Sequence, residues 1–186
     1  MTEKTFTWDE PSAVLQKAAT MSGLDALRAM RDGELPGPPI AALMSMGITE
    51  VEPGRVTFTS EPGEEHYNPI GVVHGGLACT LLDTVVGCAA HTMLAAGVGY
   101  TSIDLNVSYL RPITLSTGTI TAVGEVVKAG RRVIFAKGTI FDADGRVRAG
   151  VYLDHFARSG KRGGAWMDVC RTPFDDEARP RVPVAF

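Results

Sequence analysis

Residues 66–84 read HYNPIGVVHGGLACTLLDT and join a polar loop to a long apolar segment. The join is the tripeptide His74-Gly75-Gly76, after which a run of helix-forming apolar residues begins. One carboxylate, Asp83, interrupts that run. A carboxylate among Leu, Val, Ala and Cys is costly to bury unless it is paired or used. We therefore expect Asp83 to be a buried acid with a partner or a chemical role.

The two glycines are expected to start the helix and to leave backbone N–H groups accessible to a ligand. Such N–H groups, together with the helix dipole, suit an anion or a developing oxyanion. The simpler alternative is that the glycines only permit a tight turn from loop to helix. The tripeptide taken alone favours this simpler alternative.

The spacing between Gly75 and Asp83 limits how they can act together. Eight residues of helix span roughly 12 Å at 1.5 Å per residue, which exceeds the reach of an Asp side chain. A catalytic site that uses both groups would therefore need two copies of the helix, antiparallel across a two-fold axis. A structural alternative makes Asp83 the N-cap of a helix that starts at Thr84. The unbroken run Leu77–Leu82 argues against that alternative.

The flanking sequence predicts an α+β fold with a five- to six-stranded antiparallel sheet around one long central helix. Period-2 alternation predicts a strand over Thr101–Leu110 that places Ser102 and Leu105 on opposite faces. Further strands are expected over Arg55–Ser60 and, joined by hairpins, over residues 117–127, 132–141 and 146–156. The uncovered side of such a sheet favours a homo-oligomer.

Three regions are predicted along the chain. Residues 1–47 form an N-terminal helical extension, in which Gly23 separates two short helices. Residues 48–157 form the domain with the sheet and the central helix. Residues 158–186, rich in Gly, Arg and Pro, form an irregular tail with no assigned function.

Composition excludes several classes of function. A net charge of −3 argues against nucleic acid as the main partner. The apolar run Leu77–Val98 contains Asp83 and His91, so a buried core helix is favoured over a membrane span, and no secretory signal is recognised at the N-terminus. The expected location is cytoplasmic. The three cysteines have no paired spacing, so no disulfide framework, metal site or cofactor is expected.

Three segments together resemble the hotdog-fold acyl-CoA thioesterases, in particular the PaaI- and Them2-like branch of the 4-hydroxybenzoyl-CoA thioesterase superfamily. They are residues 68–76 (NPIGVVHGG), residues 81–83 (LLD) and residues 102–112 (SIDLNVSYLRP). The resemblance covers about residues 50–157. It implies hydrolysis of an acyl-CoA thioester in a site built across a dimer interface, with a dimer as the minimal active unit and a dimer of dimers as the larger alternative.

The resemblance also implies roles for individual residues. The Gly75 amide would polarise the thioester carbonyl, helped by Asn68. Asp83 would act as general base on water or as direct nucleophile, and Ser102 would position the attacking water. His74 and Gly76 would contribute to substrate binding, His74 mainly by holding the turn through backbone hydrogen bonds. His66 is interpreted as a surface loop residue.

A basic hairpin and two alternative functions remain open. Lys128, Arg131 and Arg132 stand where related proteins contact the phosphates of coenzyme A, although a basic turn is often only solvated. One alternative function is a hydratase or dehydratase in which His74 and Asp83 serve as acid and base. The other is a non-catalytic acyl-CoA-binding protein. The sequence leaves the identity of the acyl group open.

Overall fold

The structure is a computed structural model, and it describes residues 2–159. Three short helices come first: α1 (Pro11–Ala18), α2 (Gly23–Arg31) and α3 (Pro39–Leu43). The long helix α4 (Gly75–His91) lies among seven strands: β1 (Met46–Glu52), β2 (Arg55–Ser60), β3 (Gly99–Asp104), β4 (Val107–Tyr109), β5 (Ile120–Ala129), β6 (Val133–Phe141) and β7 (Val147–Ser159). Two 3₁₀ turns, Glu64–His66 and Leu115–Thr117, complete the set.

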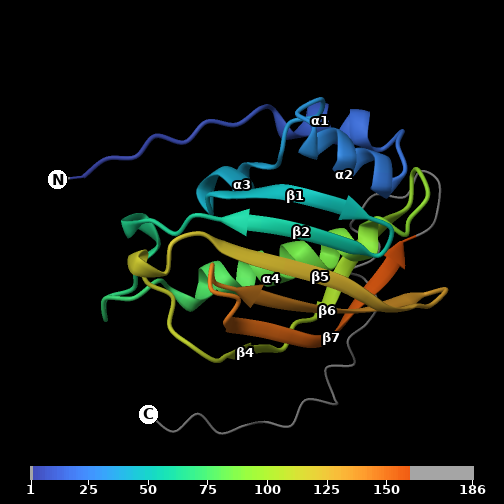
Figure 1. Cartoon of the computed structure of the whole chain (residues 1–186). Coiled ribbons are helices and arrows are strands. Elements are labelled where there is room, and N and C mark those ends of the chain that lie inside the picture. Colours follow the sequence, from blue (N-terminus) through green and yellow to red (C-terminus); the bar gives the residue numbers. More distant parts are fainter. Residues whose placement is uncertain (1, 160–186) are drawn as a thin grey trace, which may run out of the picture.

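The strands form one antiparallel sheet in the order β1-β2-β5-β6-β7-β3, and β4 also pairs with β7. Strands β3 and β4 are consecutive segments along the same neighbour, so the sheet has six positions. Figure 1 shows the sheet curving across α4, which lies behind β5 and β6 in this view. The predicted hotdog arrangement, an antiparallel sheet wrapped around one central helix, is confirmed.

Helix α4 supplies the centre of the hydrophobic core. Its buried residues, which lie on the sides that face the sheet, are Leu77, Ala78, Leu81, Leu82, Val85, Val86, Gly87, Ala89 and Ala90. The helix lies very close to β5 at Gly124, where an added Cβ would stand 2.3 Å from the Val85 carbonyl oxygen. Glycine is therefore the residue that permits this approach between a strand and a helix backbone.

The N-terminal helices dock at the far end of α4. Gly23, which begins α2, donates its N–H to the Leu94 carbonyl at 3.0 Å, and a Cβ there would lie 2.0 Å from the His91 carbonyl oxygen. Helices α2 and α3 also pack against β1, and Figure 1 shows all three helices beyond that strand at the edge of the sheet. None of the helices within residues 2–159 is both long and apolar enough to cross a membrane.

Two differences from the predicted elements affect the site. The strand predicted over Thr101–Leu110 is split between β3 and β4, with a register shift against β7 between Ser102 and Asp104. Apart from its first two residues, the predicted irregular tail at 158–186 lies outside the described residues. Strands β5, β6 and β7 lie within a few residues of their predicted ranges.

Candidate active site

The start of α4 leaves one backbone donor without a partner. His74 is the N-cap, and its Nδ1 accepts the Gly76 N–H at 2.8 Å. The Leu77 N–H donates to the His74 carbonyl at 3.0 Å. Within residues 2–159 no group accepts the Gly75 N–H. The first turn of the helix therefore presents a single N–H to a ligand, with the positive end of the helix dipole behind it.

Tyr109 holds the same turn from the other side. Its hydroxyl donates to the Gly75 carbonyl at 3.1 Å, while its ring lies 3.2 Å from where a Cβ on residue 75 would stand. The peptide between Gly75 and Gly76 is thus fixed at its carbonyl by Tyr109 and at its N–H by His74. Partial burial, followed by the neighbouring Cys79 thiol, raises the pKa of the Tyr109 phenol, which keeps its proton at neutral pH. This contact was not predictable from local sequence patterns, because it joins residues far apart along the chain.

Asn68 shapes the loop that precedes the helix. Its Oδ1 accepts the Ile70 N–H at 3.1 Å and the Val72 N–H at 3.2 Å, and Gly71 completes the turn with φ of 84°. Both partners are donors, so the side-chain oxygen must face them. The Nδ2 amide is the end of the side chain left to donate outward, since no described residue accepts from it.

His66 is buried, and its interpretation as a surface loop residue was wrong. The side chain retains 9% exposure, and its Nδ1 accepts the Gly63 N–H at 2.9 Å. Its Nε2 lies 2.9 Å from the Leu43 carbonyl, which only accepts, so Nε2 carries the proton. Its own carbonyl accepts the His74 N–H at 2.7 Å. His66 therefore ties the loop that carries Asn68 to both α3 and the N-cap.

Asp83 lies in the interior of α4 and accepts a hydrogen bond from Ser102. The helix begins at Gly75, as predicted, which excludes the alternative that Asp83 is an N-cap. The expected full burial was wrong: Asp83 is only partly buried in the single chain, on a stripe of the helix that the sheet leaves uncovered. The Ser102 hydroxyl donates to Oδ1 at 2.7 Å. This bond fixes one carboxylate oxygen and leaves the other accessible.

An irregularity in β3 turns Ser102 toward the helix. Simple alternation placed Ser102 opposite Leu105, and the structure contradicts this: Ser102 reaches Asp83, while Leu105 packs partly buried against the core. The register shift between Ser102 and Asp104 accounts for the change, because an extra residue in one strand reverses the alternation beyond it. Ile103, at the shift, is 48% exposed.

The groups beyond Asp83 on the same side of α4 are neutral near pH 7. Burial, and then the Asp83 charge, raises the pKa of Cys88 to about 12. The pKa of Tyr100 is raised well above its ordinary value by burial and then by Cys88 and Asp83. Burial lowers the pKa of His91, whose ring lies 5.3 Å from that of Tyr100. Asp83 is thus the one carboxylate beside the neutral side chains of Cys88, His91 and Tyr100.

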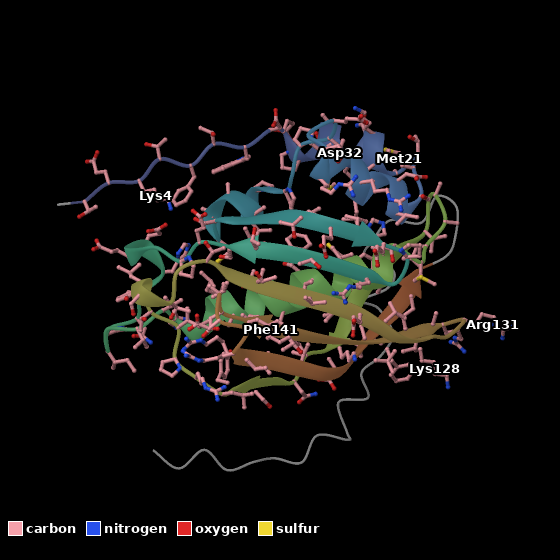
Figure 2. All side chains as sticks on the ribbon, viewed as in Figure 1. Lys4, Met21, Asp32, Lys128, Arg131 and Phe141 are labelled. Atoms are coloured by element: carbon pink, nitrogen blue, oxygen red, sulfur yellow. The ribbon has the colours of Figure 1, made fainter. Side chains whose placement is uncertain are left out.

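The basic residues predicted to contact phosphates lie apart from the helix start. Lys128, Arg131 and Arg132 are exposed at the hairpin between β5 and β6. Figure 2 shows Lys128 and Arg131 extending into solvent, at the end of the molecule opposite to the start of α4. None of the three forms an ion pair with another residue in the described range. One chain therefore does not bring this cluster to its own Gly75.

A cavity of about 200 Å³ opens beside Gly75. Its lining residues come from the start of α4, the segment after β4 and the start of β7: Val73, His74, Gly75, Ala78, Tyr109, Leu110, Arg111, Pro112, Ile113, Arg148 and Ala149. Sequence reasoning did not identify this cavity, because its walls come from separate elements. Within residues 2–159, no cluster of three or more His, Cys, Asp or Glu side chains is arranged to hold a metal ion.

Arg148 contributes to the cavity wall but is already paired. Its guanidinium binds the buried Asp142 carboxylate and donates to the Pro112 carbonyl at 2.8 Å. Burial by itself would raise the pKa of Asp142. The Arg146 N–H and the Arg148 guanidinium outweigh that effect and lower it. The pair anchors the segment after β4 to β7, and it offers the cavity little unpaired charge.

Comparison with known proteins finds similar sequences and structures among the thioesterases. The sequence model of the thioesterase superfamily matches residues 70–149, which include the helix start, Asp83 and Ser102. Over these residues the chain is similar to the thioesterase superfamily. Human acyl-coenzyme A thioesterase 13 is 33% identical over 88 residues, which are 47% of this chain and 61% of that protein. The chain thus spans less than two thirds of this relative's length.

Solved structures of the superfamily agree with the fold. The phenylacetic acid degradation-related protein of Ralstonia eutropha is 26% identical with a TM-score of 0.64, and the match covers 70% of this chain and 98% of that one. Zebrafish thioesterase superfamily member 2 is 28% identical with a TM-score of 0.57, over 74% of this chain and 95% of that one. The predicted relationship to hotdog-fold thioesterases is confirmed.

Proposed function

We propose that this chain hydrolyses acyl-CoA thioesters to a free carboxylic acid and coenzyme A, in a site that two copies of the chain share. One observation carries the proposal. The Gly75 N–H, which has no partner among residues 2–159, and the Asp83 carboxylate lie on one helix, eight residues apart, and Asp83 accepts a hydrogen bond from Ser102 of β3. Gly75 and Asp83 are roughly 12 Å apart along the helix, too far to act on one carbonyl carbon. Gly75 of one copy would therefore act with Asp83 of a second copy.

The exposed features of the chain support a two-fold pair. Strand β3 stands at the edge of the sheet, and the uncovered stripe of α4 beside it carries Asp83. Pairing of two β3 edges would continue the sheet across both copies and bring their α4 helices together in antiparallel orientation. Gly75 and Asn68 of one copy would then complete a site with Asp83 and Ser102 of the other.

The chemistry follows from these groups. The thioester carbonyl oxygen accepts the Gly75 N–H and the Asn68 amide, which favours the negative charge that develops there. Asp83 takes a proton from water, whose oxygen attacks the carbonyl carbon, while Ser102 holds the carboxylate in position. The tetrahedral intermediate then collapses with loss of the CoA thiolate, which gains a proton. Direct attack by Asp83 is the alternative first step and uses the same residues.

The basic hairpin fits the outer part of the same substrate. Lys128, Arg131 and Arg132 project into solvent far from the chain's own Gly75. In the two-copy site, these three side chains would contact the phosphates of a CoA that is bound partly by the second copy. No cofactor takes part, since coenzyme A enters as part of the substrate.

Thiol release tests the proposal. Purified protein is expected to liberate free thiol from at least one acyl-CoA, and Asp83→Asn should lower kcat about 10²–10⁴-fold by removing the base. The Asn side chain still accepts from Ser102, so the fold should be kept. Asp144→Asn, an identical change at an exposed residue of the β6–β7 turn, is the matched control.

Three results would overturn the proposal. Full activity of Asp83→Asn would show that Asp83 acts neither as the base nor as the nucleophile. Binding of acyl-CoA without turnover across a broad panel would indicate a non-catalytic binding protein. Formation of a 3-hydroxyacyl product from an enoyl-CoA would indicate a hydratase.

A further inference from the structure

We infer that His66 is a positioning residue for the hydrolysis: it fastens the N-cap of α4 to the N-terminal extension (residues 2–45), which thereby holds the Gly75 N–H in place. The inference rests on the proposed function, because it takes that N–H as the donor to the substrate carbonyl. It gives a catalytic role to a part of the chain outside residues 70–149, which match the thioesterase superfamily. His66 itself is buried and does not line the cavity beside Gly75.

Three hydrogen bonds join His66 to three parts of the chain. The ring Nδ1 accepts the Gly63 N–H at 2.9 Å, and the ring Nε2 donates to the Leu43 carbonyl at 2.9 Å. The His66 backbone carbonyl accepts the His74 N–H at 2.7 Å. Because His66 is only 9% exposed, water competes little for these bonds. His66 therefore connects the end of α3 directly to the start of α4.

The path from His66 to the proposed catalytic donor is short. The Gly75 N–H belongs to the peptide bond between His74 and Gly75, and His74 is the N-cap of α4. A displacement of the His66 carbonyl would carry His74 with it and turn that N–H. Misplacement of a reacting group by about 1 Å can lower a rate roughly 10²-fold. His66 can therefore affect kcat without touching the substrate.

The α3 end of this link is fixed to the rest of the fold. Leu43 is the last residue of α3, where carbonyl groups lack partners within the helix. The next carbonyl, that of Met44, accepts the Ser60 hydroxyl at 2.9 Å. The Ser45 carbonyl accepts the Glu61 N–H at 3.0 Å. Figure 1 shows α3 beside the segment that follows β2, so the Leu43 carbonyl is a fixed point next to the loop that carries His66.

A second link between the extension and this loop is exposed. Lys4, labelled in Figure 2, forms an ion pair with Glu65, which precedes His66. The Lys4 side chain is 44% exposed, and exposed ion pairs contribute little to stability. The buried bond from His66 to Leu43 is therefore the link whose loss should have a measurable effect.

Two substitutions separate the two hydrogen bonds of the ring. In His66→Asn the short amide can take the place of Nδ1 and accept the Gly63 N–H, but it does not reach Leu43. In His66→Gln the longer amide can take the place of Nε2 and donate to the Leu43 carbonyl, but it leaves the Gly63 N–H unpaired. Each variant loses one buried hydrogen bond, so Tm should fall by a similar amount in both.

The test measures kcat, KM and Tm of both variants with an acyl-CoA that the wild type hydrolyses, at a temperature where circular dichroism shows each protein folded. The kcat of His66→Asn is expected to fall about ten- to a hundred-fold, whereas that of His66→Gln should stay within about three-fold of the wild type. KM should change little in either variant. Ser60→Ala, which removes the bond to Met44, is the control and should lower Tm without lowering kcat.

Amide hydrogen exchange tests the link without a substrate. The segment that contains His74 and Gly75 should exchange faster in His66→Asn than in His66→Gln, because only the former releases α3. Equal exchange rates would overturn the link, whatever the activity.

The kinetic outcomes separate this inference from the function on which it rests. Equal kcat values of the two His66 variants, or a loss in Ser60→Ala as large as in His66→Asn, would overturn the positioning role and leave the hydrolase standing. Absence of thiol release by the wild type from every acyl-CoA tested would overturn the proposed function, and with it the catalytic role of His66.

Discussion

At the scale of single residues, the site depends on side chains that hold the backbone around it in place. Asn68 keeps its own loop closed with Oδ1, and His74 and Tyr109 fix one peptide from opposite sides. The groups assigned to catalysis, the Gly75 N–H and the Asp83 carboxylate, are therefore oriented before a ligand arrives. Such preorganised donors account for much of the rate enhancement in acyl transfer.

Asn68→Asp separates the two roles of that side chain. The carboxylate still accepts the Ile70 and Val72 N–H groups, so Tm should stay close to wild type. It has no N–H to donate, so kcat for thiol release should fall about 10²–10³-fold. The measurements are kcat and Tm of the variant. A wild-type kcat would show that Asn68 only holds its loop and does not donate to the substrate.

Gly75 permits a direct test of the backbone donor. Gly75→Pro removes the N–H, and proline suits this first helical position after an extended N-cap. Gly75→Ala adds the same Cβ against the Tyr109 ring but keeps the N–H, so it measures the crowding alone. We expect kcat of the proline variant to lie about 10²–10³-fold below that of the alanine variant. Equal kcat values would show that this N–H does not stabilise the transition state.

At the scale of elements, α4 and the sheet are in contact at backbone distance. The approach of Gly124 to the Val85 carbonyl fixes how deeply the helix sits against β5, and through it the height of Asp83 relative to Ser102. The position of α4 against the sheet is therefore set by Gly124, which lies away from the residues assigned to catalysis. The docking of Gly23 on His91 holds the other end of the same helix.

Gly124→Ala should disturb this contact. An added Cβ 2.3 Å from a backbone oxygen forces the helix away, and such overpacking costs about 1–3 kcal/mol. Differential scanning calorimetry should show Tm lowered by roughly 2–12 °C. Gly47→Ala in β1, where nothing lies within 4 Å of the added Cβ, is the control and should leave Tm unchanged or slightly higher. A Gly124→Ala protein as stable as that control would contradict the close contact.

The sequence predicted what local periodicity determines. The start of α4 at Gly75, the hairpins of β5 to β7 and the distance between Gly75 and Asp83 all follow from spacing along the chain. The shift that puts Ser102 and Leu105 on the same side of the chain did not, because alternation carries no mark of where an extra residue enters a strand. The contact of Tyr109 was not predicted and His66 was misjudged for a related reason: their partners lie far away in sequence.

At the scale of the whole molecule, the proposed site is divided between copies, and a mixed dimer can test that division. A heterodimer of Asp83→Asn and Gly75→Pro chains, purified through two different tags, would contain one doubly altered site and one intact site. Its kcat per dimer should be about half that of the wild type. If each chain held a complete site of its own, both sites would be defective and the heterodimer would be nearly inactive. The two parent homodimers, each nearly inactive, are the controls.

The two edges of the sheet are not equivalent, and this limits how many copies can join by strand pairing. Helices α2 and α3 pack against β1, whereas β3 ends the other side without a helix beyond it among residues 2–159. Among residues 2–159, the sheet therefore has one edge that can pair with a strand of another copy, so each chain can form one such pairing. Association through β3 therefore terminates at two copies and cannot propagate into a fibre, however high the protein concentration. Any larger assembly has to use a different surface of the pair.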